Sequence, residues 1–457
     1  MHNRLVTFLN SNNSLYECQY GFRTGRSCEH ALLTAQKTIL DALNKREIAL
    51  LLLIDFSKAF DMVEHSILLR KLENYGIRGI ALNWVKSYLS NREQFVTVSG
   101  KDSAKSEMAY GVPQGSILGP LLFIIYINDI PEISKLAKFI LYADDANIIV
   151  TGNTITEVNE KILALANTLL EWVDSNGLAL NLKKTHYVIF SRQRLDNDAL
   201  SLNMANTPIE RKTEARFLGV IVDEKMTWKS HITAIKIKMS RYIGIMYRLR
   251  GVLPIQARKQ IFHSFVQSHL NYCSLIWGFS SKSNIEALFT KQKKGIRAIM
   301  PGRVNYYFKD GKLPTHTKPG FNELGVMTVH NIIVQNTLLL LSKISGSLHS
   351  TVPISVVNTI DLDAPTHGST HDTCRDWLDN YNCTLTRNSL FFKGPLLKID
   401  PELSQTLLSP TSLLSIKALR GNIKRTLLDI QKRGDFNEWQ SENFILFNIK
   451  GLRQSSR

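Results

Sequence analysis

Two adjacent acids, Asp144 and Asp145, interrupt an otherwise apolar stretch, FILYADDANIIV at residues 139–150. The flanks are rich in Ile, Leu and Val, which predicts two buried strands joined by a tight turn that carries Tyr142 and both acids. Carboxylates at the tip of a buried hairpin are costly unless a cation balances them, and their oxygen atoms are ligands that suit Mg²⁺. A plain turn with solvated acids is the alternative for this tetrapeptide taken alone.

A third acid, Asp55, follows a seven-residue apolar run at residues 48–54. The run is too short to cross a membrane and fits a central strand that is buried on both faces. If this strand lies beside the strand at 139–142, Asp55 joins Asp144 and Asp145 in one acidic cluster. Such clusters hold two metal ions about 3.5–4 Å apart and support in-line phosphoryl transfer.

The overall composition is that of an ordinary globular protein. The chain has 457 residues, of which 44% are hydrophobic and 21% charged, and this length allows two or three domains. No apolar stretch reaches the roughly 18 residues of a membrane span, and no signal peptide follows Met1. Five scattered cysteines predict no disulfide framework, so we expect an intracellular protein without a membrane partner.

Positive charge is concentrated in one segment. The formal net charge is +17, and residues 225–303 hold fifteen Lys and Arg against one acid, Glu286, which leaves +14 there. The aromatic residues of this segment include Trp228, Tyr242, Tyr247, Tyr272 and Trp277. Basic residues interleaved with aromatic rings indicate a nucleic-acid partner, with a solvated basic face as the alternative.

Hydrophobic periodicity predicts the remaining elements. We expect two helices within residues 1–47, and further helices at 62–75, 80–90, 155–175, 228–250, 254–270, 283–300, 326–345 and 412–432. We expect a strand pair at 93–99 and 104–110, and single strands at 187–190 and 216–222.

Two glycine-rich turns could approach a substrate closely. GVPQGSILGP at 111–120 predicts a rigid turn that places Gln114 near a nucleotide and Pro120 in the first turn of a buried helix. QYGFRTGRS at 19–27 combines two glycines with two arginines, which favours contact with phosphates. The alternatives are a plain strand-to-helix turn and a surface loop that ends at Ser27 as a helix N-cap.

The C-terminal part carries weaker signals. Residues 304–320 are typical of a linker, and residues 321–457 predict mixed helices around a polar middle, of unknown role. A possible metal-binding group comprises His367, His371, Cys374 and Cys383. Their spacing matches none of the regular zinc patterns, so metal binding by this group stays open.

The order of these motifs resembles that of the reverse transcriptases of non-LTR (LINE-like) retrotransposons, and among them the jockey-type elements. The matching segments are QYGFRTGRS (19–27), IDFSKAFD (54–61), GVPQGSILGPLLF (111–123), YADD (142–145), NGLALNLKKT (176–185) and FLGVIVD (217–223). Together they are highly specific, whereas any one of them alone would not be.

The resemblance implies an α+β right-hand polymerase. A palm of antiparallel sheet with packed helices would span residues 48–223, after a fingers remnant at 1–47 and before a basic helical thumb at 224–303. The activity implied is that of an RNA-directed DNA polymerase, which adds dNTPs to a primer 3′-hydroxyl. The implied partners are an RNA template encoded by the element and a DNA primer or nicked target DNA, and the implied location is the nucleus.

The resemblance also assigns the chemistry to particular residues. Asp55 and Asp144 would bind two Mg²⁺ ions, with Asp145 as the companion acid and Mn²⁺ as an alternative metal. Lys184 matches the basic residue that is proposed to protonate the leaving pyrophosphate.

Other residues would contact the substrates. Phe60 matches the aromatic gate that excludes a ribose 2′-hydroxyl, and the nucleotide would also meet Gln114, Gly115 and Tyr142. Arg23 and Arg26 would contact the template or its phosphates, and the strand at 217–223 would form the primer grip.

The chain departs from the family near its start. A fingers segment with an arginine–proline pair and an upstream endonuclease domain are expected before QYGFR, and Cys28 stands where the family usually has Thr. We therefore expect an N-terminally truncated reverse transcriptase, with an inactive nucleic-acid-binding fragment as the alternative. An RNA-dependent RNA polymerase shares the palm, but a bulky ring at Phe60 argues against it.

Overall fold

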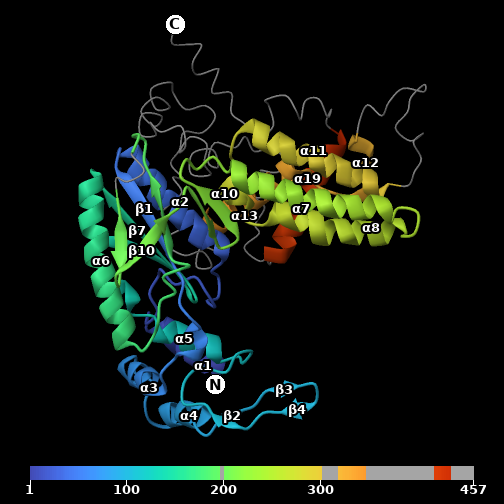
Figure 1. Ribbon diagram of the computed structural model, residues 1–457. Helices are drawn as coiled ribbons and strands as arrows, with labels where there is room; N and C mark the ends of the chain where they lie inside the picture. The colour runs from blue at the N-terminus through green and yellow to red at the C-terminus, as the bar shows by residue number, and fades with distance from the viewer. Residues whose placement is uncertain (196–199, 301–316, 346–415, 434–457) are drawn as a thin grey trace, which may run out of the picture. The chain divides into compact units, whose positions relative to one another are not determined.

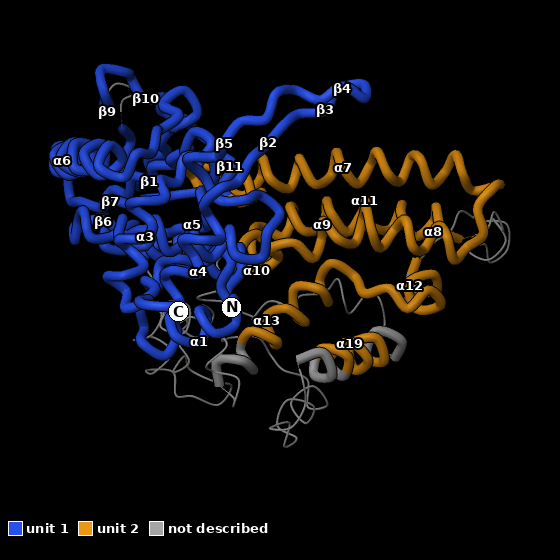
Figure 2. Tube along the Cα trace, turned by 90° about the horizontal axis from the view of Figure 1, so that it is seen from below, with its two compact units in different colours: residues 1–217, 353–355 blue, residues 218–352, 356–457 orange. Residues whose placement is uncertain are grey.

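The computed structural model describes residues 1–195, 200–300, 317–345 and 416–433. Over these residues the chain forms two compact units, and it passes from the first to the second between Phe217 and Leu218 (Figure 2). None of the helices in the described part is long and apolar enough to cross a membrane.

Some of the sequence predictions fall outside the described residues. These are the candidate metal group of His367, His371, Cys374 and Cys383, and residues 304–316 of the predicted linker.

A six-stranded sheet with the strand order β6-β7-β1-β8-β10-β9 forms the centre of the first unit. Its strands are β1 (Ile48–Ile54), β6 (Ala137–Tyr142), β7 (Asp145–Gly152), β8 (His186–Phe190), β9 (Leu202–Met204) and β10 (Thr207–Arg211). Neighbouring strands are antiparallel except β8 and β10, which are parallel. All residues of β1 are buried and β1 lies between β7 and β8, which confirms the predicted central strand.

Helices cover both faces of this sheet (Figure 1). Successive side chains of β1 point to opposite faces, and Leu50 and Leu52 share one hydrophobic core with Ile162 of α6 (Ile155–Ser175). Helix α2 (Cys28–Asn44) packs against β1, β6 and β7 on the other face. Burial of each such Leu side chain contributes about 1.5–3 kcal/mol, so this double packing fixes the end of β1 where Asp55 follows.

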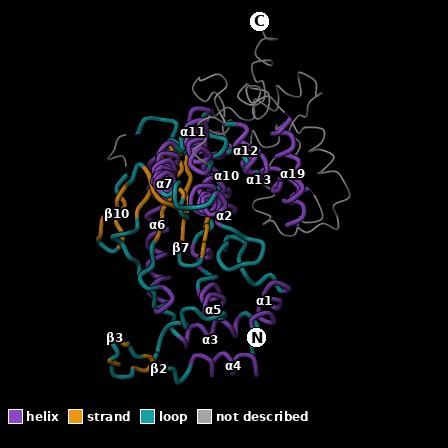
Figure 3. Tube along the Cα trace, turned by 90° about the vertical axis from the view of Figure 1, so that its right-hand side faces the viewer, coloured by secondary structure: helices purple, strands orange, loops and turns teal. Residues whose placement is uncertain are grey.

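Short helices gather at one end of the sheet (Figure 3). They are α1 (His2–Ser11), α3 (His65–Asn74), α4 (Gly79–Leu89) and α5 (Gly119–Tyr126), with the 3₁₀ turns η1 (Ala59–Asp61) and η2 (Ile130–Ile133). A ribbon is formed by β2 (Glu93–Gln94), β3 (Thr97–Val98), β4 (Lys101–Asp102) and β5 (Ser106–Glu107). The pairing of β2 with β5 confirms the predicted strand pair, but β3 pairs with β4, so the second strand begins at Lys101 rather than at residue 104. The predicted N-cap of α2 is also confirmed, because Ser27 Oγ accepts a hydrogen bond from His30 N at 3.2 Å.

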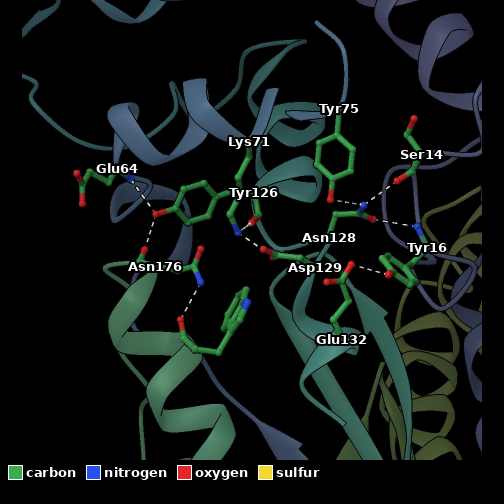
Figure 4. Close-up of polar contacts among 11 residues, drawn as sticks. Ser14, Tyr16, Glu64, Lys71, Tyr75, Tyr126, Asn128, Asp129, Glu132 and Asn176 are labelled. Atoms are coloured by element: carbon green, nitrogen blue, oxygen red, sulfur yellow. Dashed lines mark hydrogen bonds and ion pairs between the residues drawn. The ribbon is translucent and has the colours of Figure 1, made fainter. Parts of the chain in front are cut away.

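A buried polar junction joins the short helices to one another (Figure 4). Asn128 is fully buried at its centre. Its Nδ2 donates to Ser14 O and to Tyr75 Oη, each at 2.8 Å, and its Oδ1 accepts from Tyr16 N at 2.9 Å. One side chain therefore connects the segment after α1 with α3 and with the end of α5.

Lys71 forms the second half of the junction. Its Nζ donates to Asp129 Oδ1 at 2.7 Å and to Tyr126 O at 2.6 Å, and lies 5.3 Å from the centroid of the Trp172 ring. Burial lowers the pKa of Lys71, while the charge of Asp129 opposes that shift. The Tyr126 hydroxyl accepts from Glu64 N at 3.3 Å, so the junction also holds the segment that follows Asp61.

Removing the central amide should destabilise the first unit strongly. Asn128→Ala leaves two acceptors and one donor of the chain without a partner, at a cost of about 1–3 kcal/mol for each buried group. We expect the free energy of unfolding in urea to fall by about 3 kcal/mol or more. Asn12→Ala, at an exposed position, is the control, and an equally small change in both variants would contradict the assignment.

Helices make up most of the described part of the second unit. They are α7 (Lys229–Arg248), α8 (Ile255–Phe262), α9 (Ser268–Asn271), α10 (Ser274–Trp277), α11 (Lys282–Ile299), α12 (Lys318–Leu324), α13 (Val329–Ser345) and α19 (Ile416–Arg433). Helices α7 and α11 pack closely, and the Phe262 ring fits against Gly295, where a Cβ atom would lie 2.6 Å from it.

Three predicted elements differ from the structure. The strand expected at 216–222 is divided into β11 (Glu214–Phe217) and β12 (Val220–Asp223), because Leu218 and Gly219 take φ values of 44° and 81°. The helix expected at 254–270 contains a π-helical turn, η3 (His263–Gln267). The end of the expected linker is helical, because α12 begins at Lys318.

Candidate active site

The site begins at the hairpin of β6 and β7. Tyr142 pairs with Asp145, which leaves a two-residue turn of Ala143 and Asp144. Ala143 takes φ 54°, as the favoured two-residue hairpin turns require at their first central position. Asp144 and Asp145 are exposed at this turn, and the predicted strand–turn–strand is confirmed.

The register of the sheet brings the third acid to this turn. Ile54 pairs with Ala146 across the antiparallel β1–β7 ladder. Asp55 directly follows Ile54 and Asp145 directly precedes Ala146, so the two acids leave the sheet next to each other. The structure therefore brings Asp55, Asp144 and Asp145 together in one acidic cluster.

The pKa of Asp145 is raised above its ordinary value. Partial burial of the carboxylate at the base of the turn is the largest cause, followed by the charge of Asp144 and then by that of Asp55. The ionised form is therefore less favourable in the folded chain than in the unfolded chain, and the group costs stability as the pH rises through the raised pKa.

Replacing Asp145 with asparagine should therefore raise the Tm when no divalent cation is present. The gain should be larger at pH 7.5 than at pH 4, because protonation already removes part of the repulsion at the lower pH. Thermal unfolding in EDTA at both pH values measures this, with Glu160→Gln, an exposed acid on α6, as the control. A Tm below that of the wild type at pH 7.5 would refute the repulsion.

Lys184 lies at the cluster because the loop 178–185 runs along the end of β1. Asn181 N donates to Asp55 O at 2.7 Å, and the buried Thr185 Oγ1 accepts from Asp55 N at 3.4 Å. These two bonds place Lys184 Nζ 3.6 Å from Asp55 Oδ2, with the lysine side chain exposed. The residue expected to act as a general acid is thus in contact with an expected metal ligand.

Gln19 and Gly21 support the turn from behind, a role that the sequence interpretation missed. Gln19 is fully buried, and its Oε1 accepts from Ala143 N at 3.1 Å and from Gly21 N at 2.8 Å. Tyr20 N donates to Leu141 O at 2.8 Å, so this segment adds a short parallel bridge to β6. The sequence Gln-Tyr-Gly at residues 19–21 was the signal that could have indicated this role, but the sequence analysis assigned a role only to Arg23 and Arg26.

Both arginines of that segment bond to the chain itself. Arg23 Nη1 donates to Tyr16 O at 2.7 Å, and Arg26 Nη2 forms an ion pair with Glu17 Oε2 at 2.5 Å. Burial, and then the charge of Arg26, lower the pKa of Arg23 to about 10, so Arg23 remains a cation at neutral pH. Contact of these residues with a template or its phosphates stays a prediction.

Two of the residues expected to contact the nucleotide lie in one neighbourhood. The half-buried Phe60 ring stacks on Phe123 with centroids 4.3 Å apart, and Phe22 meets it edge-on at 6.4 Å. Gln114 Nε2 donates to Asp61 Oδ1 at 2.7 Å, directly after Phe60 in the chain. Helix α5, which carries Phe123, thus supports the ring that is expected to act as the gate.

Gly115 and Tyr142 complete the set of expected nucleotide contacts. Gly115 is exposed and takes φ 78°, with nothing within 4 Å of the position that a Cβ atom would occupy. Tyr142 is half-buried at the end of β6. Nucleotide contact by either residue stays a prediction.

The donor set of the cluster fits a divalent cation. The described residues contain no ready-made group of three or more His, Cys, Asp or Glu side chains that could hold a metal ion. The three acids nevertheless offer carboxylate oxygens, which hard divalent cations prefer, and a cation would relieve the repulsion at Asp145.

Comparison with known proteins identifies the first unit. Residues 1–222 match the family described as "Reverse transcriptase (RNA-dependent DNA polymerase)". The chain is 28% identical over 316 residues to the "Probable RNA-directed DNA polymerase from transposon BS" of Drosophila melanogaster, with 65% of this chain and 34% of the relative covered. It is 27% identical over 307 residues to the "RNA-directed DNA polymerase from mobile element jockey" of the same organism, with 65% and 33% covered.

Two telomerases are among the similar solved structures. A telomerase from Candida albicans in complex with a fragment of telomeric RNA aligns with a TM-score of 0.34 at 16% identity, over 78% of this chain and 56% of that one. Apo telomerase from Candida tropicalis aligns with a TM-score of 0.39 at 12% identity, over 83% and 61%.

The chain spans about a third of the length of the curated relatives named above. The match begins at residue 1 and ends within β12, so it contains all three acids of the cluster and Lys184. The expected α+β fold is confirmed by the six-stranded sheet and its covering helices. Residues 1–222 are thus a reverse transcriptase domain, similar to those of the jockey-type non-LTR retrotransposons that the motif order had predicted.

Proposed function

We propose that this chain is the RNA-directed DNA polymerase of a non-LTR retrotransposon, and that it adds dNTPs to a primer 3′-hydroxyl. One observation supports this above all others. Asp55, Asp144 and Asp145 converge at the shared end of β1 and β7, and Lys184 lies beside them. Clustered carboxylates of this kind are the requirement for phosphoryl transfer assisted by two metal ions.

The metal ligands in this proposal are Asp55 and Asp144, with Asp145 as the companion acid. They would hold two Mg²⁺ ions, or Mn²⁺ in their place. When bound, such ions lower the pKa of the primer hydroxyl and offset the charge of the triphosphate.

The chain's own groups would bind, orient and move protons. The primer hydroxyl would lose its proton to solvent, and its oxygen would bond to the α-phosphorus as the bond to pyrophosphate breaks. The Lys184 ammonium would donate a proton to the leaving oxygen and be reprotonated from solvent. Phe60 would exclude a ribose 2′-hydroxyl, and Gln114 would contact the incoming nucleotide. Arg23 and Arg26 would place positive charge near the template phosphates.

Primer extension with the purified chain tests the proposal directly. A DNA primer annealed to an RNA template should be extended when dNTPs and Mg²⁺ are present, and not when EDTA replaces the metal. Failure to extend on any template at any Mg²⁺ or Mn²⁺ concentration would disprove polymerase activity for this chain.

Nucleic-acid binding without chemistry is the competing function. The concentration of Lys and Arg in residues 225–303 supports it, because positive charge on one segment binds nucleic acid whether or not chemistry follows. It predicts a primer–template affinity that falls steeply with salt, together with no incorporation of nucleotide. Binding and extension measured on the same preparation separate the two functions.

The choice between dNTPs and NTPs tests Phe60. Phe60→Ala should raise the ratio of NTP to dNTP use by about 10–200-fold, the range for filling or emptying a small volume in a binding pocket. Phe22→Ala removes an exposed neighbouring ring and serves as the control. If the ratio of NTP to dNTP use is unchanged in Phe60→Ala, Phe60 is not the gate, and RNA-dependent RNA polymerase activity is again an alternative.

The remaining partners follow from the relatives rather than from the site. We propose that the template is the RNA of the element itself and that the primer is a DNA end, such as that of a nicked target. Such a reaction would take place in the nucleus.

A further inference from the structure

The π-helical turn η3 changes the surface of the second unit. The sequence predicts a regular helix through residues 254–270. At His263–Gln267, η3 inserts one extra residue into a turn of this helix. Phe265 lies in the middle of this turn and 45% of its surface is exposed, although its neighbour Val266 is fully buried. Turns of this type are rare and occur frequently at functional sites.

The exposed ring belongs to an aromatic group that we call the aromatic platform, formed by Tyr242, Phe265 and His269. Tyr242 of α7 and Phe265 are stacked, with centroids 4.8 Å apart and planes 24° from parallel. His269 of α9 lies 6.4 Å from Tyr242 at 31°. The Tyr242 ring is therefore within 24° and 31° of parallel to the other two rings, and all three rings are partly open to solvent.

A positive charge lies beside the platform. Lys238 lies one turn before Tyr242 on α7 and is exposed, and its charge acts on His269. Burial and Lys238 both lower the pKa of His269, so this ring is uncharged at neutral pH and presents an apolar face. Residues 225–285 contain no acid, and Glu286 is in contact with His330, 3.3 Å away.

We infer that the aromatic platform stacks an unpaired base of single-stranded nucleic acid. This inference rests on the proposed function and goes beyond it, because contact of a basic surface with phosphates needs no aromatic ring. Base–ring stacking tolerates any sequence, since every base has a flat face, and nearby cations hold the backbone. A protein partner at this site would meet Lys238 and, within residues 225–285, no acid with which to pair.

The experiment separates bases from phosphates. The full chain is titrated with a fluorescent single-stranded DNA and with the same strand in which abasic spacers replace the bases. The wild type should bind the strand with bases about 5–150-fold more tightly, the range for one stacked base. A 2-aminopurine in the strand should be quenched when it is bound.

Variants connect this preference to the platform. Phe265→Ala and Tyr242→Leu should each bring the affinity for the strand with bases down to that for the abasic strand, and leave the abasic affinity unchanged. Ile237→Ala, which removes an exposed apolar side chain from α7, should keep the full preference. Equal affinity of the wild type for the two strands, or a preference that survives both variants, would overturn the inference.

Two further outcomes are informative. If the wild type forms dimers in sedimentation and Phe265→Ala does not, the platform binds a second copy and the inference is wrong. Absence of primer extension in the wild type would defeat the proposed polymerase but leave the base preference measurable. The two proposals can therefore fail separately.

Discussion

Asp144→Asn is expected to lower primer extension on an RNA template by at least about 10³-fold, since a bound metal supplies several kcal/mol of transition-state stabilisation. The substitution removes a carboxylate from the tip of the β6–β7 turn without changing its volume, and the turn is held by backbone pairing that the side chain does not join. The rate of dNTP incorporation under single-turnover conditions measures the effect.

The control for this variant is Glu160→Gln, which removes an exposed carboxylate from α6 of the same unit. It should extend primers at the wild-type rate. Asp144→Asn should also keep its affinity for a primer–template, because the contacts with phosphates come from basic residues. Equal incorporation by Asp144→Asn and the wild type would show that the acidic cluster does not carry the chemistry.

Gly21→Ala is expected to lower primer extension by about 10–100-fold, although residue 21 lies outside the acidic cluster. An added Cβ atom would lie 2.4 Å from Ala143 N and 3.0 Å from Tyr142 C, so the backbone of the turn must move. Overpacking of this kind costs about 1–3 kcal/mol, and a displacement of about 1 Å at a reacting group can cost 10²-fold in rate. The measurement is again single-turnover extension.

Gly251→Ala provides the matched control, because nothing lies within 4 Å of the position that its Cβ atom would occupy. Gly21→Ala should remain folded by circular dichroism, and its loss should appear in the extension rate rather than in primer–template affinity. Full activity in Gly21→Ala would mean that the turn can shift without moving Asp144.

Local sequence patterns were sufficient to predict several strands and helices and to identify the three acids. The seven apolar residues at 48–54 predicted β1, the interrupted run at 139–150 predicted the β6–β7 hairpin, and Ser27 predicted the start of α2. Each of these signals is local, such as the length of an apolar run or a capping hydroxyl, so the sequence alone is sufficient to predict the element.

Structural features that depend on residues far apart in the chain were not predicted. Nothing near Gln19 indicates that its amide oxygen supports Ala143, 124 positions later. The break at Leu218 is equally hidden, because a leucine rarely adopts positive φ and the sequence reads as one continuous strand. The π-helical turn η3 is a third case, since its residues have an ordinary helical pattern.

By itself, the sequence determined which residues could perform the chemistry, because carboxylates after apolar strands and the order of the motifs are local features of the chain. Only the tertiary structure decided that Asp55 lies next to Asp145 and that Lys184 Nζ lies 3.6 Å from Asp55 Oδ2. The physical reason is that strand register and side-chain packing join segments far apart in the chain, and no spacing in the sequence encodes those distances.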